Sequence, residues 1–455
     1  MNTATMSEIM HHAPVVVCGM IGHTADGKST TSKKLSGKAT EQHSKEMEHG
    51  STMKLGYTNV KIFKCAVCPK PKCYKAGPSS VKDLNCEYCD EVMELVQHIS
   101  LVDCPGHWKL TSTMLSGTCI MDYTILIESI QNKSIPAPQT WEHMVATSVA
   151  GIECAVVCLN KIDTLSTGEI RSKIESKVNT LKDFLVKFDY KKEIIPMSAV
   201  FGVNINVLCE YLVNLKGKNR NFETYAKMIG IRSFDINKQR QLNKGSDLKG
   251  GTLGGSLTQG ILKVGDIVKI YPGYTKSVGT DSSRIKLADG TTKNITFNEW
   301  KYCPIEAQVI SIHSELESLE KAYPGSLIGV QLDIDPALSR NDNLVGNVMV
   351  PSEAVHDVKV VDKLELTITY IFPDISTGNP KKLNIEIGEY LKIHVNANEV
   401  RGIVNKYRES KKRIVLILDT PIAISETDKI VISDNKSINI LGMCKINNYD
   451  ECKNI

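Results

Sequence analysis

Residues Val15–Thr30 read VVVCGMIGHTADGKST, and this stretch decides the fold of the first part of the chain. Its opening valines begin an apolar run that predicts a buried strand. Gly22–Ser29 then follow the pattern G-x-x-x-x-G-K-S, in which the glycines let the backbone wrap around phosphate oxygens. A strand that leads into such a loop, with a helix after it, predicts a binding site for a nucleoside triphosphate.

The side chains of this loop suit a triphosphate with its magnesium ion. Lys28 is expected to reach the terminal phosphates, and Ser29 to supply a hydroxyl ligand to Mg²⁺. Because backbone N–H groups point inward along such a loop, the neighbouring residues become candidates for phosphate contact as well. The predicted phosphate-binding set is Ala25, Asp26, Gly27, Lys28, Ser29 and Thr30.

A second motif indicates which base is bound. Asn160-Lys161-Ile162-Asp163 follows the apolar run Ala155–Leu159, which predicts a buried strand. The Asp163 carboxylate can accept hydrogen bonds from the N1–H and 2-amino groups of guanine, whereas adenine would leave it unpaired. The motif therefore predicts guanine. A further contact with the base is expected from the residues after the apolar run Ile194–Met197, namely Ser198, Ala199 and Val200.

A third motif lies between these two. Leu101–His107 read LVDCPGH, a D-x-x-G pattern at the end of an apolar run. Asp103 is expected to contact Mg²⁺ through a water molecule, and the Gly106 backbone N–H to sense the γ-phosphate. A segment of this kind is ordered by GTP and relaxes with GDP. The three motifs together predict a GTP-dependent switch.

This set of motifs resembles the translational GTPases, and further runs resemble one family among them, the gamma subunits of eukaryotic translation initiation factor two. Those runs are Lys54–Ile62 (KLGYTNVKI), Ile231–Lys238 (IRSFDINK) and Tyr323–Val330 (YPGSLIGV). The resemblance implies a GTPase that grips initiator methionyl-tRNA and works with alpha and beta subunits. It also implies GTP hydrolysis on the small ribosomal subunit, slow without an activating factor, and reloading by an exchange factor.

The resemblance implies roles for single residues. His107 would orient the attacking water, and Thr52 would ligate Mg²⁺ and close over the γ-phosphate. Tyr57 matches an aromatic residue near the tRNA acceptor end, although packing within a strand is an equal alternative. Asp26 stands where the family usually has His, and Trp108 where an acidic residue is commoner. Because a carboxylate beside the polyphosphate adds like-charge repulsion, we expect the chain to bind nucleotide more weakly than an Asp26→His variant would.

Two other functions are compatible with the motifs. The first is an elongation-type factor that carries elongator or selenocysteinyl tRNA, which the cysteine cluster and the Ile231–Lys238 run oppose. The second is a non-hydrolysing scaffold, in which Asp26 and Trp108 have disabled turnover and GTP has a structural role.

Two cysteine pairs within the first part of the chain predict a metal site. Cys65, Cys68, Cys86 and Cys89 have the C-x₂-C…C-x₂-C spacing of a tetrahedral zinc knuckle. The segment between the pairs is rich in proline and is expected to be a loop with no packing of its own, held together by zinc. A reduced, metal-free loop is the alternative, and Cys73 is a further candidate ligand.

Composition limits the remaining function classes. The 14 cysteines are expected to be reduced, and residues Met1–Ala13 show no secretory signal, so a cytoplasmic protein is expected. No apolar run approaches the ~20 residues that span a bilayer. The net charge of +4 does not indicate a nucleic-acid binder, so tRNA phosphates would have to meet local basic patches.

The strand and helix patterns divide the chain into a tail, a GTP-binding domain and two strand-rich domains. Residues 1–14 form the tail, and residues 15–225 alternate strands with helices, which predicts a parallel-rich sheet with helices on both faces. The cysteine knuckle is inserted at residues 65–89. Residues 226–350 and 351–455 show strands and glycine turns, which predict two β-barrels.

Overall fold

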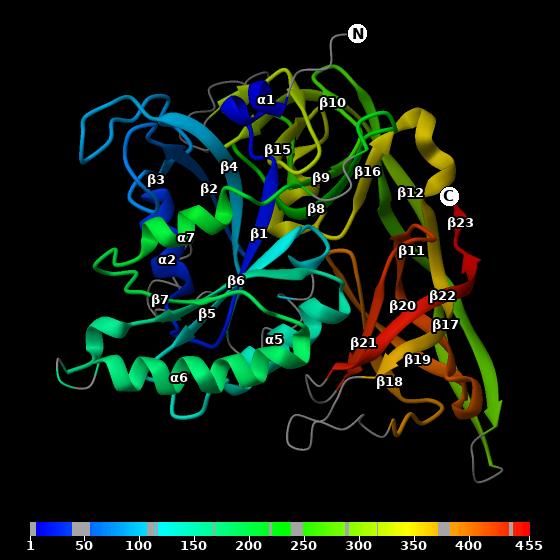
Figure 1. The fold of residues 1–455 in the computed structure, drawn as a ribbon. Coiled ribbons are helices and arrows are strands. Elements are labelled where there is room, and N and C mark those ends of the chain that lie inside the picture. The colour runs from blue at the N-terminus through cyan, green and yellow to red at the C-terminus, as the bar shows by residue number, and fades with distance from the viewer. Residues whose placement is uncertain are drawn as a thin grey trace. The chain divides into compact units, whose positions relative to one another are not determined.

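A computed structural model of the chain (Figure 1) describes residues 6–38, 55–106, 114, 117–166, 168, 170–217, 221–237, 249–286, 291–315, 317–371, 383–435 and 440–455. The chain divides into two compact units. The N-terminal unit comprises residues 1–220 together with residues 314–319 and 323–327. The C-terminal unit comprises residues 221–313, 320–322 and 328–455.

The N-terminal unit alternates helices and strands as the sequence pattern predicts. Its elements are α1 (Met6–His12), β1 (Val16–Ile21), α2 (Lys28–Ser36), β2 (Gly56–Lys64), β3 (Tyr74–Pro78), β4 (Glu94–Asp103), β5 (Tyr123–Ser129), α5 (Pro138–Val149), β6 (Glu153–Asn160), α6 (Ile170–Leu185), β7 (Ile194–Pro196) and α7 (Ile205–Leu212).

These strands form one seven-stranded sheet in the order β3-β2-β4-β1-β5-β6-β7. The neighbouring strands β4, β1, β5, β6 and β7 pair in parallel, whereas β2 runs antiparallel to both β4 and β3. Every residue of β1 is buried, as expected for a strand with both faces covered. The prediction of a parallel-rich sheet is confirmed. The carboxyl ends of β1, β4 and β6 carry the three nucleotide motifs to one edge of this sheet.

The segment between the two cysteine pairs differs from the expected loop. β3 pairs with β2 from Val60↔Pro78 to Lys64↔Tyr74, and its residues Tyr74 and Gly77 are buried. The prediction of a segment without packing of its own was wrong here, because its prolines flank the short strand or end it and leave its ladder hydrogen bonds intact.

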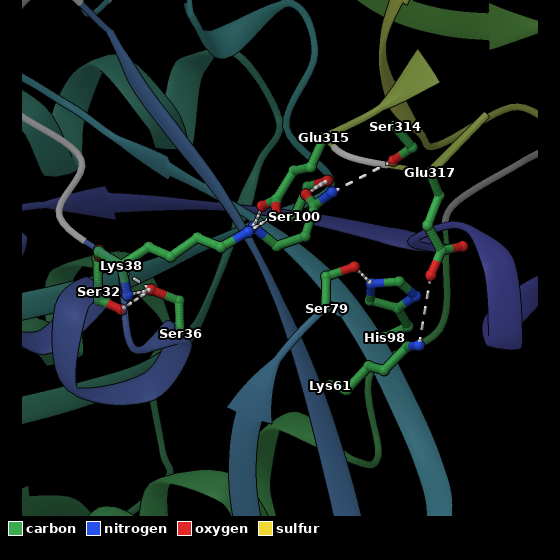
Figure 2. Close-up of polar contacts among 11 residues, drawn as sticks. Ser32, Ser36, Lys38, Lys61, Ser79, His98, Ser100, Ser314, Glu315 and Glu317 are labelled. Atoms are coloured by element: carbon green, nitrogen blue, oxygen red, sulfur yellow. Dashed lines mark hydrogen bonds and ion pairs between the residues drawn. The ribbon is translucent and has the colours of Figure 1, made fainter. Parts of the chain in front are cut away.

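A short segment from far along the sequence also belongs to the N-terminal unit (Figure 2). The Glu315 carboxylate accepts the backbone N–H of Asn59 at 2.6 Å and forms an ion pair with Lys38. Glu317 lies 4.0 Å from Lys61, whose side chain is only 3% exposed. Acidic side chains of this segment therefore meet donors on β2 and just beyond the end of α2.

Replacing Glu315 with alanine is expected to destabilise the N-terminal unit by about 1–3 kcal/mol, because the Asn59 backbone N–H would lose its acceptor. Glu315→Gln keeps an oxygen for that N–H and should recover most of the loss. Urea unfolding of both variants, with the exposed Glu320→Ala as control, measures the difference. Equal midpoints for Glu315→Ala and Glu320→Ala would show that the contact adds nothing.

The C-terminal unit is built almost entirely from strands. Its strands are β8 (Lys227–Phe234), β9 (Thr252–Gln259), β10 (Leu262–Lys263), β11 (Ile267–Lys286), β12 (Thr292–Ser314), β14 (Lys321–Ala322), β15 (Leu327–Leu332), β16 (Val348–Pro351), β17 (Lys359–Ile371), β18 (Tyr390–Val395), β19 (Asn398–Arg408), β20 (Arg413–Ile424), β21 (Ile430–Asp434), β22 (Ile440–Glu451) and β23 (Lys453–Asn454). The short strand β13 (Glu317–Leu319) belongs to the N-terminal unit.

Two sheets account for most of these strands. The first has strands of this unit in the order β11-β16-β8-β9-β15-β12, and an additional pairing of β11 with β12 joins the two ends of this row. The second is a closed barrel in the order β17-β20-β19-β18-β21-β22. Its interior is filled by alternate residues such as Leu364, Leu366 and Ile393, each fully buried. The predicted β-barrel architecture after the GTPase domain is confirmed.

Among the described residues, no helix is both long and apolar enough to cross a bilayer.

Candidate nucleotide site and cysteine cluster

The loop between β1 and α2 wraps back on itself with positive φ at Gly22 (137°), Ala25 (63°) and Gly27 (98°). A Cβ atom on Gly22 would lie 2.0 Å from the Ile127 carbonyl oxygen, and one on Gly27 would lie 2.3 Å from Asn160 Nδ2. No larger residue fits at either position without displacing its neighbours. The two glycines of the sequence pattern are therefore required by this backbone path and its packing.

Lys28 lies across this loop. Its Nζ donates hydrogen bonds to the carbonyl oxygens of Gly22 at 3.0 Å and His23 at 2.8 Å. Burial lowers the pKa of Lys28, while Asp103 and Asp26 act in the opposite direction. A buried ammonium group held in this way, at the first residue of α2, suits phosphate charge.

The D-x-x-G segment lies against the same loop. Asp103 is the last residue of β4, is fully buried and pairs in register with Met20 of β1. A Cβ atom on Gly106 would lie 2.5 Å from Lys28 Nζ and 2.7 Å from the Thr24 nitrogen. Only a glycine backbone can come so close to the lysine. His107, Trp108 and Thr52 lie outside the described residues.

The guanine motif is tied to the phosphate loop by one side chain. Asn160, at the end of β6, donates from Nδ2 to the Asp26 carbonyl oxygen at 2.9 Å and accepts the Ala199 N–H at Oδ1, 3.0 Å away. Lys161 adopts a positive φ of 65°, and the Asp163 side chain that follows is exposed. The structure therefore brings the phosphate loop, the N-K-I-D motif and Ala199 together. Ser198 is buried beside them, and Val200 is exposed.

Tyr57 lies elsewhere in the same unit. It is a half-buried residue of β2, opposite Val102 in the ladder with β4. Its neighbour Gly56 pairs with Asp103, so Tyr57 lies one step from the D-x-x-G segment. Both interpretations of Tyr57 stay predictions.

The four knuckle cysteines form one compact cluster. The Sγ–Sγ distances are 3.5 Å for Cys65–Cys89 and 3.6 Å for both Cys68–Cys86 and Cys68–Cys89, and all four sulfurs lie within 4.8 Å of one another. Four sulfurs bound at about 2.3 Å from a tetrahedral zinc ion would be about 3.8 Å apart. The cluster therefore has the size of a zinc site.

Two further observations concern the ligand set of this cluster. Backbone N–H groups of Cys68 and Val67 lower the pKa of Cys65 to about 7, which favours the thiolate form that binds metal. Among the described residues, the group close enough to share one ion contains the four knuckle cysteines and not Cys73. Cys73 instead contributes its backbone carbonyl, which accepts the Cys65 N–H at 2.8 Å.

Comparison with known proteins gives the family. Residues 13–217 match the Elongation factor Tu GTP binding domain. The chain is 34% identical over 439 residues to the gamma subunit of eukaryotic translation initiation factor 2 from Encephalitozoon cuniculi, covering 96% of this chain and 93% of that protein. The chain belongs to this gamma-subunit family. Subunit 3 of the same factor from Drosophila melanogaster is 34% identical over 441 residues, with 95% of this chain and 88% of that protein covered.

Solved structures of elongation factors share the fold. A bacterial selenocysteine-specific elongation factor superposes with a TM-score of 0.64 at 18% identity, covering 96% of this chain but only 59% of that longer chain. Elongation factor SelB from Methanococcus maripaludis, in complex with a GTP analogue, gives 0.63 at 20% identity, covering 97% of this chain and 80% of that chain. As a member of the gamma-subunit family with this GTP-binding domain, the chain is a translational GTPase of initiation.

Three polar residues of this GTPase site carry no motif and were missed by sequence reasoning. Asn132 donates hydrogen bonds to both Asp26 and Glu128, and Glu128 is the fully buried residue before the last one of β5. His143 of α5 accepts the Gly22 backbone N–H at Nδ1, 3.2 Å away, and burial lowers the pKa of His143 to about 3. A neutral imidazole therefore supports the first glycine of the loop. The sequence offered one signal for these residues, the acid Glu128 directly after the apolar run Ile125–Ile127.

Proposed function

We propose that this GTPase binds initiator methionyl-tRNA in its GTP state and delivers it to the small ribosomal subunit, where GTP is hydrolysed when the start site is selected. Membership of the gamma-subunit family supports this function. The observation that supports its GTP dependence is the close approach of Gly106 to Lys28. A γ-phosphate bound at Lys28 would have to displace or order the D-x-x-G segment. GTP and GDP would then stabilise different conformations of that segment.

The residues divide the catalytic work as follows. Lys28 and the N–H groups of the loop neutralise the charge of the β- and γ-phosphates. Ser29 and Thr52 would hold Mg²⁺ directly and Asp103 through water, since hydroxyl and carboxylate oxygens suit this ion. His107 orients the attacking water. No arginine that could stabilise the transition state is evident in the motifs, so hydrolysis should be slow without an activating factor.

Base selection follows from the other half of the site. Asp163 accepts hydrogen bonds from the guanine N1–H and 2-amino groups, and the backbone near Ser198, Ala199 and Val200 contacts the other edge of the base. Asn160 fixes the distance between base and phosphates, because its side-chain amide forms hydrogen bonds with both the phosphate loop and Ala199.

Membership of the gamma-subunit family also supports a set of protein partners. We propose that the chain works with an alpha and a beta subunit, with an activating factor and an exchange factor, in the cytoplasm. The cysteine cluster would hold Zn²⁺, for which its four thiols and their spacing fit.

Filter binding of initiator methionyl-tRNA, elongator methionyl-tRNA and selenocysteinyl tRNA, each with a non-hydrolysable GTP analogue and with GDP, tests this function. Tight binding of initiator tRNA only with the GTP analogue is expected. Preference for elongator or selenocysteinyl tRNA would favour an elongation-type carrier.

Single-turnover GTP cleavage with the activating factor and the small ribosomal subunit is the second measurement. Absence of cleavage while tRNA still binds would favour a non-hydrolysing scaffold.

A change at Tyr57 tests the proposed tRNA contact. If its ring stacks on the acceptor end, Tyr57→Ala should weaken initiator tRNA binding by about 5- to 100-fold, whereas Tyr57→Phe should keep most of the affinity. GDP affinity and the thermal midpoint, measured for both variants, separate this loss from unfolding of β2. Unchanged tRNA affinity in a folded Tyr57→Ala protein would assign Tyr57 to strand packing.

A further inference from the structure

Two buried carboxylates, Asp26 within the phosphate-binding loop and Glu128 beside it, have side chains to which the proposed mechanism gives no role. Asp26 is 1% exposed and Glu128 is 0% exposed. The side-chain amide of Asn132 lies between them, with its Nδ2 at 3.0 Å from Asp26 Oδ1 and 2.7 Å from Glu128 Oε1. One amide group thus donates a hydrogen to each carboxylate.

The other contacts of this carboxylate pair fix its orientation. Asp26 Oδ2 accepts the His23 backbone N–H at 3.0 Å, which closes a turn within the loop. Glu128 accepts the Thr140 hydroxyl at 2.6 Å and the Ala137 N–H at 3.1 Å. The Asp26 carboxylate is therefore held by Asn132 and by the loop's own backbone.

The electrostatic setting of the pair favours a proton. Burial raises the pKa of Asp26 to about 6, and burial together with the Asp26 charge raises the pKa of Glu128 to about 7. Asn132, the His23 N–H and nearby lysines act in the opposite direction on Asp26. Lys28 and Lys161 favour the anionic form of Asp26, and His23 contacts it through its backbone N–H. Two further titratable groups bind neighbours of the pair, since His143 accepts the Gly22 N–H and Lys177 donates to the Asn132 carbonyl.

We propose that Asn132 and Glu128 are positioning residues for nucleotide binding, which hold Asp26 beside the loop and make the loop's affinity for phosphates depend on whether this carboxylate carries a proton. The inference rests on the proposed nucleotide site. An anionic Asp26 adds a negative charge next to the phosphates that Lys28 neutralises, whereas a protonated Asp26 adds none. Affinity for GDP therefore rises as the pH falls through the range in which Asp26 gains its proton.

GDP dissociation constants of the wild type and of Asp26→Asn, measured from about pH 5 to about pH 8, test this inference. The phosphate of GDP itself titrates near pH 6, so the ratio of the two constants at each pH is compared, which cancels that contribution. We expect the wild type to bind about three- to tenfold more weakly than Asp26→Asn at high pH and equally well at low pH.

Alanine variants of the two positioning residues should shift the midpoint of the ratio in the same direction, each variant being compared with its own Asp26→Asn double. Because the pKa of Glu128 lies above that of Asp26, Glu128 is protonated while Asp26 titrates, so Glu128→Gln, which keeps an acceptor for Asn132, should leave the midpoint of the ratio in place. Glu128→Ala removes that acceptor and releases the Asn132 amide from its place beside the Asp26 anion, so the midpoint should move to higher pH by about one unit. Asn132→Ala removes a donor to the anion, so the midpoint should move to higher pH by about as much. Glu153→Gln, at the far end of β6 from Asn160, serves as the matched control and should leave the ratio unchanged.

The outcomes are distinguishable. A ratio that is constant with pH, or a midpoint that stays in place in a folded Asn132→Ala or Glu128→Ala protein, overturns the inference and leaves the proposed function standing. Failure of the wild type to bind GDP at every pH overturns both. Should one of these two alanine variants not fold, the other decides the question by itself.

Discussion

Replacing Asp163 with asparagine is expected to weaken GDP binding by about 10²- to 10⁴-fold and to create affinity for xanthosine diphosphate. The carboxylate can accept two hydrogen bonds from guanine, and each bond to a charged group contributes about 1.5–3 kcal/mol. An asparagine amide presents its own N–H₂ to the guanine 2-amino group, where two donors face each other. Xanthine carries a carbonyl oxygen at that position, so the same amide donates to it.

Equilibrium binding of GDP, xanthosine diphosphate and ADP to wild type and Asp163→Asn checks this expectation. Asp183→Asn, another exposed aspartate of the same unit, is the matched control and should bind GDP as the wild type does. Because Asp163 is exposed, its replacement should leave the thermal midpoint nearly unchanged. Equal GDP affinity in the two variants would remove Asp163 from the base site.

Sequence alone predicted the parts of this molecule whose chemistry is local. The phosphate loop needs glycine at Gly22 and Gly27 because any Cβ there would meet a neighbour, so the motif is visible in the letters themselves. The strand before the loop is buried on both faces, so its apolar run is continuous. The same holds for Asn160, whose two hydrogen bonds explain why an amide ends β6.

Contacts between distant segments could not be predicted in this way. The Asp26–Asn132–Glu128 contact joins residues more than a hundred positions apart, and no periodicity or spacing records it. Glu315 belongs to the N-terminal unit although it follows a strand of the C-terminal unit, because side-chain pairing and not local pattern places it there. Strand β3 was missed for a related reason, since its ladder with β2, and no pattern within the proline-rich segment, makes it a strand.

The second large effect is expected at the cysteine cluster. Cys86→Ser with Cys89→Ser removes two of the four thiols, and the zinc content should fall from about one ion per chain to nearly none. Metal analysis of the purified double variant measures this, with Cys303→Ser, an exposed cysteine outside the cluster, as the control. Unchanged zinc content in the double variant would exclude the cluster as the zinc site.

The structural consequence of zinc loss should be local, because the ladder between β2 and β3, from Val60↔Pro78 to Lys64↔Tyr74, includes none of the four knuckle cysteines. An isolated zinc finger unfolds without its ion, since the metal supplies about 10–16 kcal/mol of its folding free energy. Here the ion would hold only the two turns around Cys65–Cys68 and Cys86–Cys89. Hydrogen exchange should therefore become faster in these turns of the double variant, while β1 and β4 keep their protection. Faster exchange throughout the sheet would instead show that the metal supports the whole N-terminal unit.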